Sequence, residues 1–275
     1  MSDKLRLDLA IAELGLAPSR SHAQALVIAG QVLVDGQQVD KPSQMVTLEQ
    51  EFSIKEQPKY VSRGGLKLEK AVEEFALDID GKVCMDVGAS TGGFTDVMLQ
   101  NGAKKVYAVD VGHGQLHYAL RQNDKVVVME RYNARNLTPD DFDELAGFGA
   151  VDVSFISLQL ILLPLFRCLS DGAHAVALIK PQFEAGRKEV GKRGVVSDDG
   201  VRMRVCQQIM SFAYGAGYGV NGLIPSPILG PKGNAEYLLH IMKADGQYQP
   251  EQFADLAKNA VKILTLGAQQ TDDGV

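Results

Sequence analysis

KVCMDVGASTGGFTD, at residues 82–96, is the stretch that decides the fold of this chain. Its first half is a nearly continuous apolar run, as expected of a strand buried on both faces of a parallel sheet. Gly88, Gly92 and Gly93 follow, and glycine permits the sharp backbone turn that leads from such a strand into a helix. The stretch therefore predicts a strand–turn–helix unit in which a ligand can approach the backbone at the carboxyl edge of a sheet.

Similar apolar, β-branched runs recur along the chain and alternate with helical patterns. The runs cover residues 104–111, 125–131, 149–155 and 174–180, and helical patterns at 94–102 and 157–169 separate several of them. A longer helix near 199–214, an antiparallel pair of strands at 218–228 and 235–243, and a last helix at 249–269 are expected to follow. This alternation predicts an α/β fold with a doubly wound, mostly parallel sheet.

The start of the chain has the pattern of a small separate α+β unit. Apolar residues at helical spacing predict a first helix over residues 5–16, which Pro18 ends. Ser21 and Gln24 resemble a capping box that opens a second helix, and Gly30 is suited to end that helix. Two helices of this length bury little apolar surface between them, so we expect them to pack against neighbouring strands.

A hairpin and a linker complete this first unit. Asp35-Gly36 between two apolar runs predicts a tight hairpin, and FSI at 52–54 predicts a further strand. Residues 55–65, KEQPKYVSRGG, have the composition of a linker because Pro58 interrupts any continuing element. We therefore expect three parts, namely 1–58, 59–248, and a helix with a polar tail over 249–275 packed on the second part.

Composition excludes several classes of protein. With 275 residues, of which 45% are hydrophobic and 23% charged, the chain has the composition of a soluble globular protein. No apolar run reaches the length of a membrane span, and the first residues lack the apolar core of a signal peptide. We therefore expect a cytoplasmic protein that does not enter a membrane.

The cysteines and histidines give no indication of a metal site. Cys84, Cys168 and Cys206 lie far apart in apolar stretches, which favours buried thiols over disulfides or metal ligands. His113 and His117 are four residues apart, but glycines flank His113 and no acidic residue lies between the two histidines. We therefore expect no bound metal.

The distribution of charge points to a polyanionic partner more clearly than its sum does. The net charge of −6 argues mildly against nucleic acid, because Lys and Arg supply most of the affinity for phosphates. Yet residues 55–70 hold five basic and two acidic side chains, and residues 180–204 hold seven basic and four acidic ones. Two local clusters of excess positive charge predict a phosphate-binding rim.

Asp110 and the glycine spacing indicate the type of cofactor. Asp110 ends the strand after the glycine loop, where a carboxylate can accept hydrogen bonds from ribose hydroxyls. The glycines are spaced G-x-x-x-G-G rather than the G-x-G-x-x-G of dehydrogenases. This spacing, with VDVGHGQL at 109–116 and YNARNL at 132–137, resembles the S-adenosylmethionine motifs of class I methyltransferases.

That resemblance implies a seven-stranded Rossmann-like methyltransferase fold with S-adenosyl-L-methionine as its cofactor. It places the adenine near Val111 and residues 133–135, and the methionine part near residues 90–93 and Asp152. The implied cofactor-binding residues are Asp86, Gly88, Ala89, Ser90, Thr91, Gly92, Gly93, Phe94, Asp110, Val111, Asn133, Ala134, Arg135 and Asp152.

Four residues scattered along the chain suggest methyl transfer to a hydroxyl. Lys67, Asp152, Lys180 and Glu236 lie in SRGGLKL, DVSFISL, LIKPQFEAG and GPKGNAEYLL, which resemble the Lys-Asp-Lys-Glu segments of FtsJ-like ribose 2′-O-methyltransferases. A ribose hydroxyl is a weak nucleophile, so an unprotonated lysine must accept its proton or stabilise the oxyanion. We assign Lys180 as the base, Asp152 as its orienter, and Lys67 with Glu236 as the pair that tunes the site.

The N-terminal unit has its own resemblance. RLDLAIAELGLAPSRSHAQALVIAGQVLVDGQQVDKP, at residues 6–42, is similar to the S4 domain, an RNA-binding module. The resemblance implicates Arg6 and Arg20 in RNA binding, with Lys41 as a further candidate. From the two basic clusters we add Arg63, Arg187 and Lys188 as RNA-binding candidates.

An S4 domain joined to this tetrad makes the chain resemble the hemolysin A-type (TlyA-like) family over residues 4–245. The resemblance implies 2′-O-methylation of cytidine in ribosomal RNA, with ribosomal RNA or ribosomal subunits as partners. Two alternatives stay open: an RNA- or ribosome-binding factor that keeps the fold without turnover, and, more distantly, a membrane-active haemolysin. The sequence leaves the target nucleotide and the oligomeric state open.

Overall fold

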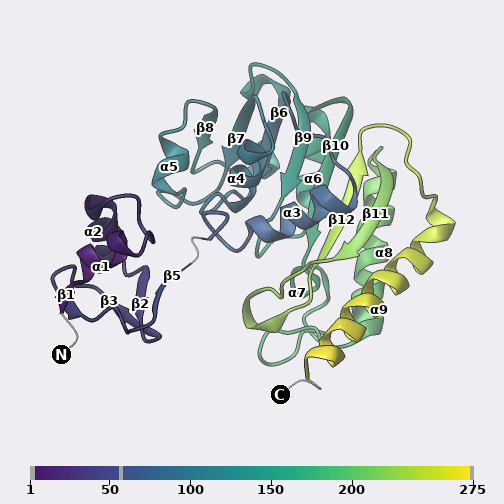
Figure 1. Ribbon diagram of the computed structural model, residues 1–275. Coiled ribbons are helices and arrows are strands. Elements are labelled where there is room, and N and C mark those ends of the chain that lie inside the picture. The colour runs from purple at the N-terminus through teal and green to yellow at the C-terminus, as the bar shows by residue number, and fades with distance from the viewer. Residues whose placement is uncertain (1–3, 56–57, 273–275) are drawn as a thin grey trace. The chain divides into compact units, whose positions relative to one another are not determined.

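The computed structural model describes residues 4–55 and 58–272, which divide into two compact units, Met1–Lys59 and Tyr60–Val275 (Figure 1). Glu56 and Gln57 of the expected linker lie outside the described residues, as do residues 1–3 and the end of the polar tail at 273–275.

The N-terminal unit packs two short helices against short antiparallel strands. Its elements are β1 (Leu5–Arg6), α1 (Leu7–Glu13), α2 (Arg20–Ile28), β2 (Val32–Val34), β3 (Gln37–Val39), β4 (Met45–Val46) and β5 (Phe52–Ile54). The middle strand β2 pairs with both β3 and β5, while β1 pairs with β4. Leu7, Ile11 and Val27 from the helices share one buried core with Val32 of the sheet.

The predicted hairpin is confirmed. Asp35 and Gly36 both have positive φ, at 51° and 76°, and they connect the paired residues Val34 and Gln37. A two-residue turn with positive φ at both positions matches the twist of the flanking strands, which is why Asp-Gly is favoured there. Gly30, with φ of 66°, follows α2 as expected.

Two details at the helix starts differ from the prediction. Ser19, rather than Ser21, caps α2, because its hydroxyl accepts a hydrogen bond from the His22 amide at 3.2 Å. The side chain of Gln24 binds Asp8 of α1 instead of closing a capping box. The first helix also begins later than predicted, at Leu7, since Leu5–Arg6 is extended and pairs with β4.

The C-terminal unit is built on a seven-stranded sheet in the order β11-β12-β10-β9-β6-β7-β8 (Figure 1). The strands are β6 (Val83–Val87), β7 (Lys105–Val109), β8 (Val126–Met129), β9 (Ala146–Val151), β10 (Leu169–Ile179), β11 (Gly219–Pro225) and β12 (Tyr237–Met242). In this sheet β12 alone runs in the opposite direction to the other six strands, and it pairs antiparallel with β10 and β11. The predicted mostly parallel sheet and its antiparallel closing pair are confirmed.

Helices cover both faces of this sheet. They are α3 (Gly65–Glu74), α4 (Gly93–Gln100), α5 (Tyr118–Arg121), α6 (Gln159–Cys168), α7 (Pro181–Glu184), α8 (Asp199–Gly215) and α9 (Phe253–Asp272), with 3₁₀ turns at Ala134–Asn136, Pro139–Asp141, Pro231–Gly233 and Pro250–Gln252. One core contains Leu68 of α3 and Phe94 of α4, and the other contains Leu162 of α6 and Ile209 of α8. The three cysteines are free and buried, as predicted.

The strand order reverses between β6 and β9, and this reversal positions the site. From β6 the chain proceeds to β7 and β8 on one side, whereas β9 and β10 lie on the other. In such sheets ligands bind outside the carboxyl ends of the strands at the point of reversal. Gly88, just after β6, and Asp152, just after β9, lie at that point.

The predicted strand run at 149–155 was too long at its carboxyl end. The last residue of β9 is Val151, paired with Val87, so Asp152 follows the strand instead of lying within it. Lys180 likewise follows β10, and Glu236 precedes β12. Among the helices of residues 4–55 and 58–272, none is both long and apolar enough to cross a membrane.

Candidate active site

The structure brings Lys67, Asp152, Lys180 and Glu236 together at the carboxyl edge of the sheet. Lys180 Nζ lies 2.5 Å from Oδ1 of Asp152, and Lys67 Nζ lies 3.9 Å from Oδ2 of the same carboxylate. Lys67 Nζ also lies 2.5 Å from Oε2 of Glu236. Lys67 and Lys180 therefore share the carboxylate of Asp152, and the carboxylate of Glu236 also binds Lys67.

Burial makes these charges dependent on one another. Glu236 is fully buried, and Lys67 and Lys180 are only 7% and 8% exposed. A buried charge is tolerated when it is paired, because removal from water is costly for an isolated ion. Gly230 packs so closely on the Glu236 carboxylate that a Cβ at position 230 would collide with it. The backbone of the loop before β12 thus closes over the ion pair.

Ser154 gives Lys180 a second polar neighbour. Lys180 Nζ donates to the Ser154 hydroxyl at 2.9 Å, on the loop that follows β9. With Asp152 and Ser154 as its partners, the amino group is held at the end of β10 in a fixed direction. A lysine fixed in this way can exchange a proton with a hydroxyl that enters beside it.

The glycine loop borders two neighbouring cavities. The larger, of about 510 Å³, is lined by eight of the predicted cofactor-binding residues, namely Gly88, Ser90, Asp110, Val111, Asn133, Ala134, Arg135 and Asp152. The smaller, of about 180 Å³, is lined by Asp86, Ala89, Thr91, Gly93, Phe94 and again Gly88, Ser90 and Asp152, and it also reaches Lys180. The cavities share walls at the point where the strand order reverses.

Gly92 and Gly88 have structural roles in this loop. Gly92 lines neither cavity. A Cβ at this position would collide with Leu116 and Leu120, and its φ of 95° serves the turn that begins α4. Gly88 has a φ of 88°, and a Cβ there would lie 2.4 Å from the Asp152 carbonyl oxygen. Only glycine allows the ends of β6 and β9 to approach this closely.

Asp110 and Asp86 supply carboxylates to the two cavities. Asp110 accepts hydrogen bonds from the amides of Ser90 and Gly112, at 2.8 and 2.6 Å, and each carboxylate oxygen can accept more than one bond. Asp86 accepts from the amide and hydroxyl of Thr95 with one oxygen, while its other oxygen is buried without a hydrogen-bond partner among the described residues. Burial raises the pKa of Asp86 to about 7.

These residues fit a nucleoside cofactor that carries an amino-acid group. The larger cavity has the volume of a small-molecule site and offers an acceptor for ribose hydroxyls at Asp110. Asp86, whose Oδ1 has no hydrogen-bond partner among the described residues, lines the smaller cavity, and a carboxylate there suits an ammonium group. His113 lies elsewhere, beside Glu130 at 3.1 Å, and no group of three or more potential ligands able to hold a metal occurs within residues 4–55 and 58–272.

Comparison with known proteins identifies the family. FtsJ-like methyltransferases match residues 60–243, and the S4 domain matches residues 5–52. YqxC of Bacillus subtilis, whose name assigns it provisionally to the rRNA methyltransferases, is 48% identical over 91% of this chain and 92% of its own length. The 16S/23S rRNA (cytidine-2′-O)-methyltransferase TlyA of Mycobacterium tuberculosis is 43% identical over 87% of this chain and 90% of its own length.

A solved structure from Streptococcus thermophilus that carries the hemolysin name agrees, with 44% identity, a TM-score of 0.73, and coverage of 98% of this chain and 100% of that one. The chain belongs to the TlyA-like hemolysin A family, with an S4 domain and an FtsJ-like methyltransferase domain.

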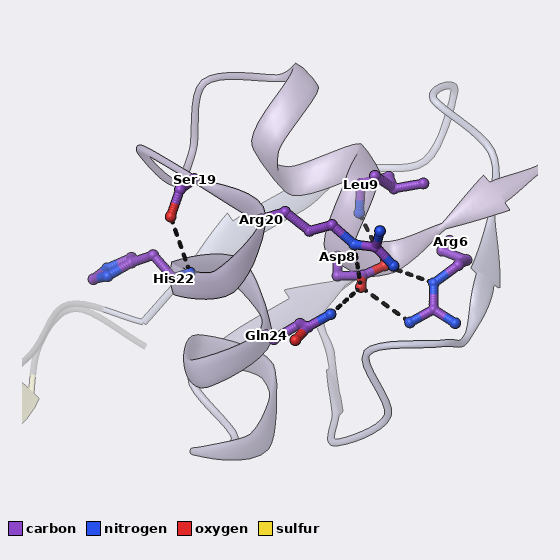
Figure 2. A network of polar contacts seen from close by, with 7 residues as sticks. All are labelled: Arg6, Asp8, Leu9, Ser19, Arg20, His22 and Gln24. Carbon is purple, nitrogen blue, oxygen red and sulfur yellow. Dashed lines mark hydrogen bonds and ion pairs between the residues drawn. The ribbon is translucent and has the colours of Figure 1, made fainter.

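The predicted RNA-binding residues fall into two groups. In the S4 domain, Lys41 is exposed, whereas Arg6 and Arg20 both bind the buried carboxylate of Asp8 (Figure 2). Both arginine side chains keep part of their surface exposed. In the FtsJ-like domain, Arg63 is exposed before α3, and Arg187 and Lys188 are exposed in the loop after α7. None of these six residues lines either cavity of the cofactor site.

A third cavity and its aromatic residues were missed by the sequence analysis. This cavity, of about 340 Å³, is lined by Phe155, Phe183, Lys232, Lys180 and Glu236, among others. Phe155 is 90% exposed, has a φ of 64°, and its ring centroid lies 5.0 Å from that of Phe183. An exposed aromatic residue with positive φ is uncommon, and strained backbone of this kind clusters at active sites and ligand-binding segments.

Proposed function

We propose that this protein transfers a methyl group from S-adenosylmethionine to the ribose 2′-hydroxyl of a cytidine in ribosomal RNA. The observation that carries the proposal is the carboxylate of Asp152, which holds Lys180 and Lys67 beside the cofactor cavities. The M. tuberculosis relative is named for this activity and is 43% identical over most of both chains.

Lys180 lies between the smaller cavity of the glycine loop and the cavity lined by Phe155 and Phe183, which supports separate places for cofactor and substrate. The cavities of the glycine loop fit the cofactor, and the cavity lined by Phe155 and Phe183 fits a nucleotide, because aromatic rings stack on bases. Ser154 borders all three cavities, and Lys180 borders the smaller cofactor cavity and the substrate cavity. In this proposal a ribose hydroxyl reaches Lys180 from one side and the methyl donor reaches it from the other.

Bound in its cavities, S-adenosylmethionine supplies a methyl group on a positively charged sulfur that leaves as a neutral thioether. Lys180, in its unprotonated form, accepts the proton of the 2′-hydroxyl as the new oxygen–carbon bond forms. Asp152 and Ser154 orient the amino group of Lys180. Lys67, held by Glu236, places a positive charge near the oxygen and stabilises the negative charge that develops there.

The S4 domain supplies RNA affinity in this proposal. Its basic residues and those near α3 and α7 would contact phosphates, which position a substrate without reading its sequence. Removal of residues 1–58 should therefore weaken binding of ribosomal RNA far more than binding of S-adenosylmethionine. Equal RNA affinity of the truncated and full-length proteins would exclude this role for the S4 domain.

A map of 2′-O-methyl nucleotides tests the activity. Ribosomal RNA from cells with and without this protein is digested and analysed by mass spectrometry, and we expect loss of 2′-O-methylcytidine at one or more positions. Purified protein with S-adenosylmethionine should restore the modification in subunits from the deficient cells, whereas Lys180→Arg protein should not. An unchanged map, with the protein still bound to ribosomal subunits, would favour a non-catalytic RNA-binding factor.

A further inference from the structure

Asp8 is the most completely enclosed acidic residue of the S4 domain. Its side chain has no exposed surface, and four residues donate five hydrogen bonds to its carboxylate (Figure 2). Arg6 binds both oxygens through Nε and Nη2, at 2.9 and 3.0 Å. Arg20 Nε and Gln24 Nε2 bind Oδ2 at 3.0 and 2.7 Å, and the Leu9 amide binds Oδ1 at 3.1 Å.

The partners of Asp8 keep it ionised although burial opposes this. The hydrogen bond from Arg6 is the largest of the influences that hold the pKa of Asp8 well below its ordinary range, and Gln24 and Arg20 act in the same direction. Two positive groups therefore surround one negative group, and the cluster keeps an excess of one positive charge. The carboxylate fixes both guanidinium groups within hydrogen-bond distance of the same oxygen, Oδ2.

The two arginines remain accessible despite this bond. The side chains of Arg6 and Arg20 are 38% and 51% exposed, and they come from different elements, since Arg6 precedes α1 and Arg20 opens α2. Asp8 engages only part of the donor set of each guanidinium, so terminal amino groups are left for a ligand. A pair of guanidinium groups held at fixed spacing suits a phosphate, which accepts several such bonds.

We propose that Asp8 is a positioning residue for RNA binding, whose buried carboxylate fixes Arg6 and Arg20 so that both direct donors at one RNA phosphate. The inference rests on the RNA-binding role of the S4 domain in the proposed function. Long side chains lose rotamer freedom when they bind a ligand, and this loss lowers affinity. Because Asp8 already restricts Arg6 and Arg20 in the free protein, less freedom is lost when RNA binds. Arginines anchored in this way bind more tightly than the same residues moving freely.

Whether Asp8→Asn strengthens or weakens RNA binding distinguishes a positioning role of Asp8 from a simple effect of its charge. Asp8→Asn removes a negative charge near the expected phosphate, so Coulomb attraction alone predicts tighter RNA binding. Positioning predicts weaker binding, because the amide cannot hold two guanidinium groups. Asp35→Asn is the matched control: it makes the same charge change in the same domain, and asparagine tolerates the positive φ of residue 35.

The experiment is filter binding of the full-length protein to radiolabelled ribosomal RNA, extracted from cells that lack the protein, at several KCl concentrations. For Asp8→Asn we expect binding about tenfold weaker, as for loss of one charge-assisted hydrogen bond. The slope of log affinity against log salt should fall in magnitude by about one. Asp35→Asn should bind as tightly as the natural protein or slightly more tightly.

A double-mutant cycle distinguishes positioning from a loss of folding. We expect Arg6→Gln/Arg20→Gln to weaken RNA binding, and the further change Asp8→Asn in that background to alter affinity by less than about twofold. Gln24→Ala, which removes a neutral partner of Asp8, should lower the midpoint of thermal unfolding while RNA affinity stays unchanged. Affinity for S-adenosylmethionine, measured in parallel by calorimetry, should be the same in all variants.

Three results would overturn the inference. If Asp8→Asn binds RNA as tightly as the natural protein while the arginine double variant binds weakly, only the role of Asp8 fails. If Asp8→Asn weakens RNA binding by the same factor in the Arg6→Gln/Arg20→Gln variant as in the natural protein, Asp8 acts through folding of the domain. If the arginine double variant binds RNA normally, the arginine contact itself is absent and the RNA-binding role of these residues in the proposed function fails with it.

Discussion

Lys67, in the first turn of α3, and Glu236, just before β12, form a buried ion pair across 169 residues of sequence. Their Nζ and Oε2 atoms are 2.5 Å apart, and Glu236 has no exposed surface. The pair connects a helix on one face of the sheet to the strand that runs against all its neighbours. It therefore contributes to the fold as well as to the candidate active site.

Removal of one member of this pair should be costly. We expect Glu236→Gln to lower the free energy of unfolding by about 3–5 kcal/mol, because among the described residues it leaves the more distant Asp152 as the remaining negative partner of the buried Lys67 ammonium. Urea denaturation followed by circular dichroism measures the change. The matched control is Glu74→Gln, which breaks the exposed Lys70–Glu74 pair of the same helix and should cost about 0.5 kcal/mol or less. A loss below about 1 kcal/mol for Glu236→Gln would show that Lys67 is solvated or neutral without its partner.

The sequence was sufficient to predict that the tetrad residues could meet. Asp152 and Lys180 follow neighbouring parallel strands, and the carboxyl ends of parallel strands lie at the same edge of a sheet. Lys67 was harder to place, because a lysine on a helix is ordinarily a solvated charge. Its contact with Glu236 depends on how α3 packs against β12, and such long-range packing has no periodic signal in the sequence.

Replacement of Lys180 should abolish turnover and spare the cofactor. Arginine stays protonated, so Lys180→Arg should reduce methyl transfer to ribosomal RNA by about 100-fold or more, as for loss of a general base. Calorimetry should find the affinity for S-adenosylmethionine nearly unchanged. Lys192→Arg, at an exposed position of the same basic segment, serves as the control and should keep full activity. Residual turnover above about one tenth would exclude Lys180 as the base.

The loop after β9 shows where prediction from sequence stopped. DVSFISL continues the apolar alternation of a strand, so nothing local indicated that pairing ends at Val151. The break turns Ser154 toward Lys180 and leaves Phe155 exposed with a positive φ. The capping residue of α2 was missed for a related reason, since Gln24 is engaged by Asp8, a partner 16 residues away that local patterns do not reveal.

Phe155 gives a prediction in which stability and activity change in opposite directions. Phe155→Gly relieves a backbone conformation that a bulky residue rarely adopts, so the protein should be as stable as the natural one or more stable. Loss of the exposed ring should nevertheless weaken productive RNA binding by about 1–3 kcal/mol, the worth of one stacked base. Steady-state methyl transfer at varied RNA concentration, together with thermal unfolding, measures both.

The control is Tyr118→Ala, because Tyr118 is another exposed aromatic residue and lines none of the three cavities. This variant should leave turnover unchanged. Equal loss in the two variants would mean that exposed aromatic surface in general, not the position of Phe155, supports RNA binding.

Asp86 gives a prediction about pH, because burial raises its pKa from 3.8 to about 7. The folded protein then holds this proton more tightly than the unfolded chain does. The contribution of Asp86 to stability is therefore most favourable below about pH 4 and declines as pH rises toward 7, by up to about 1.4 kcal/mol per pH unit.

Asp86→Asn cannot ionise, so the free energy of unfolding of the natural protein minus that of the variant should fall between pH 4 and 7 and level off above. Carboxylates remote from Asp86 titrate alike in both proteins and cancel in this difference, which urea denaturation at a series of pH values measures. A difference that stays constant from pH 4 to 8 would mean that Asp86 titrates alike in the folded and unfolded states, so that the hydrogen bonds from Thr95 offset its burial.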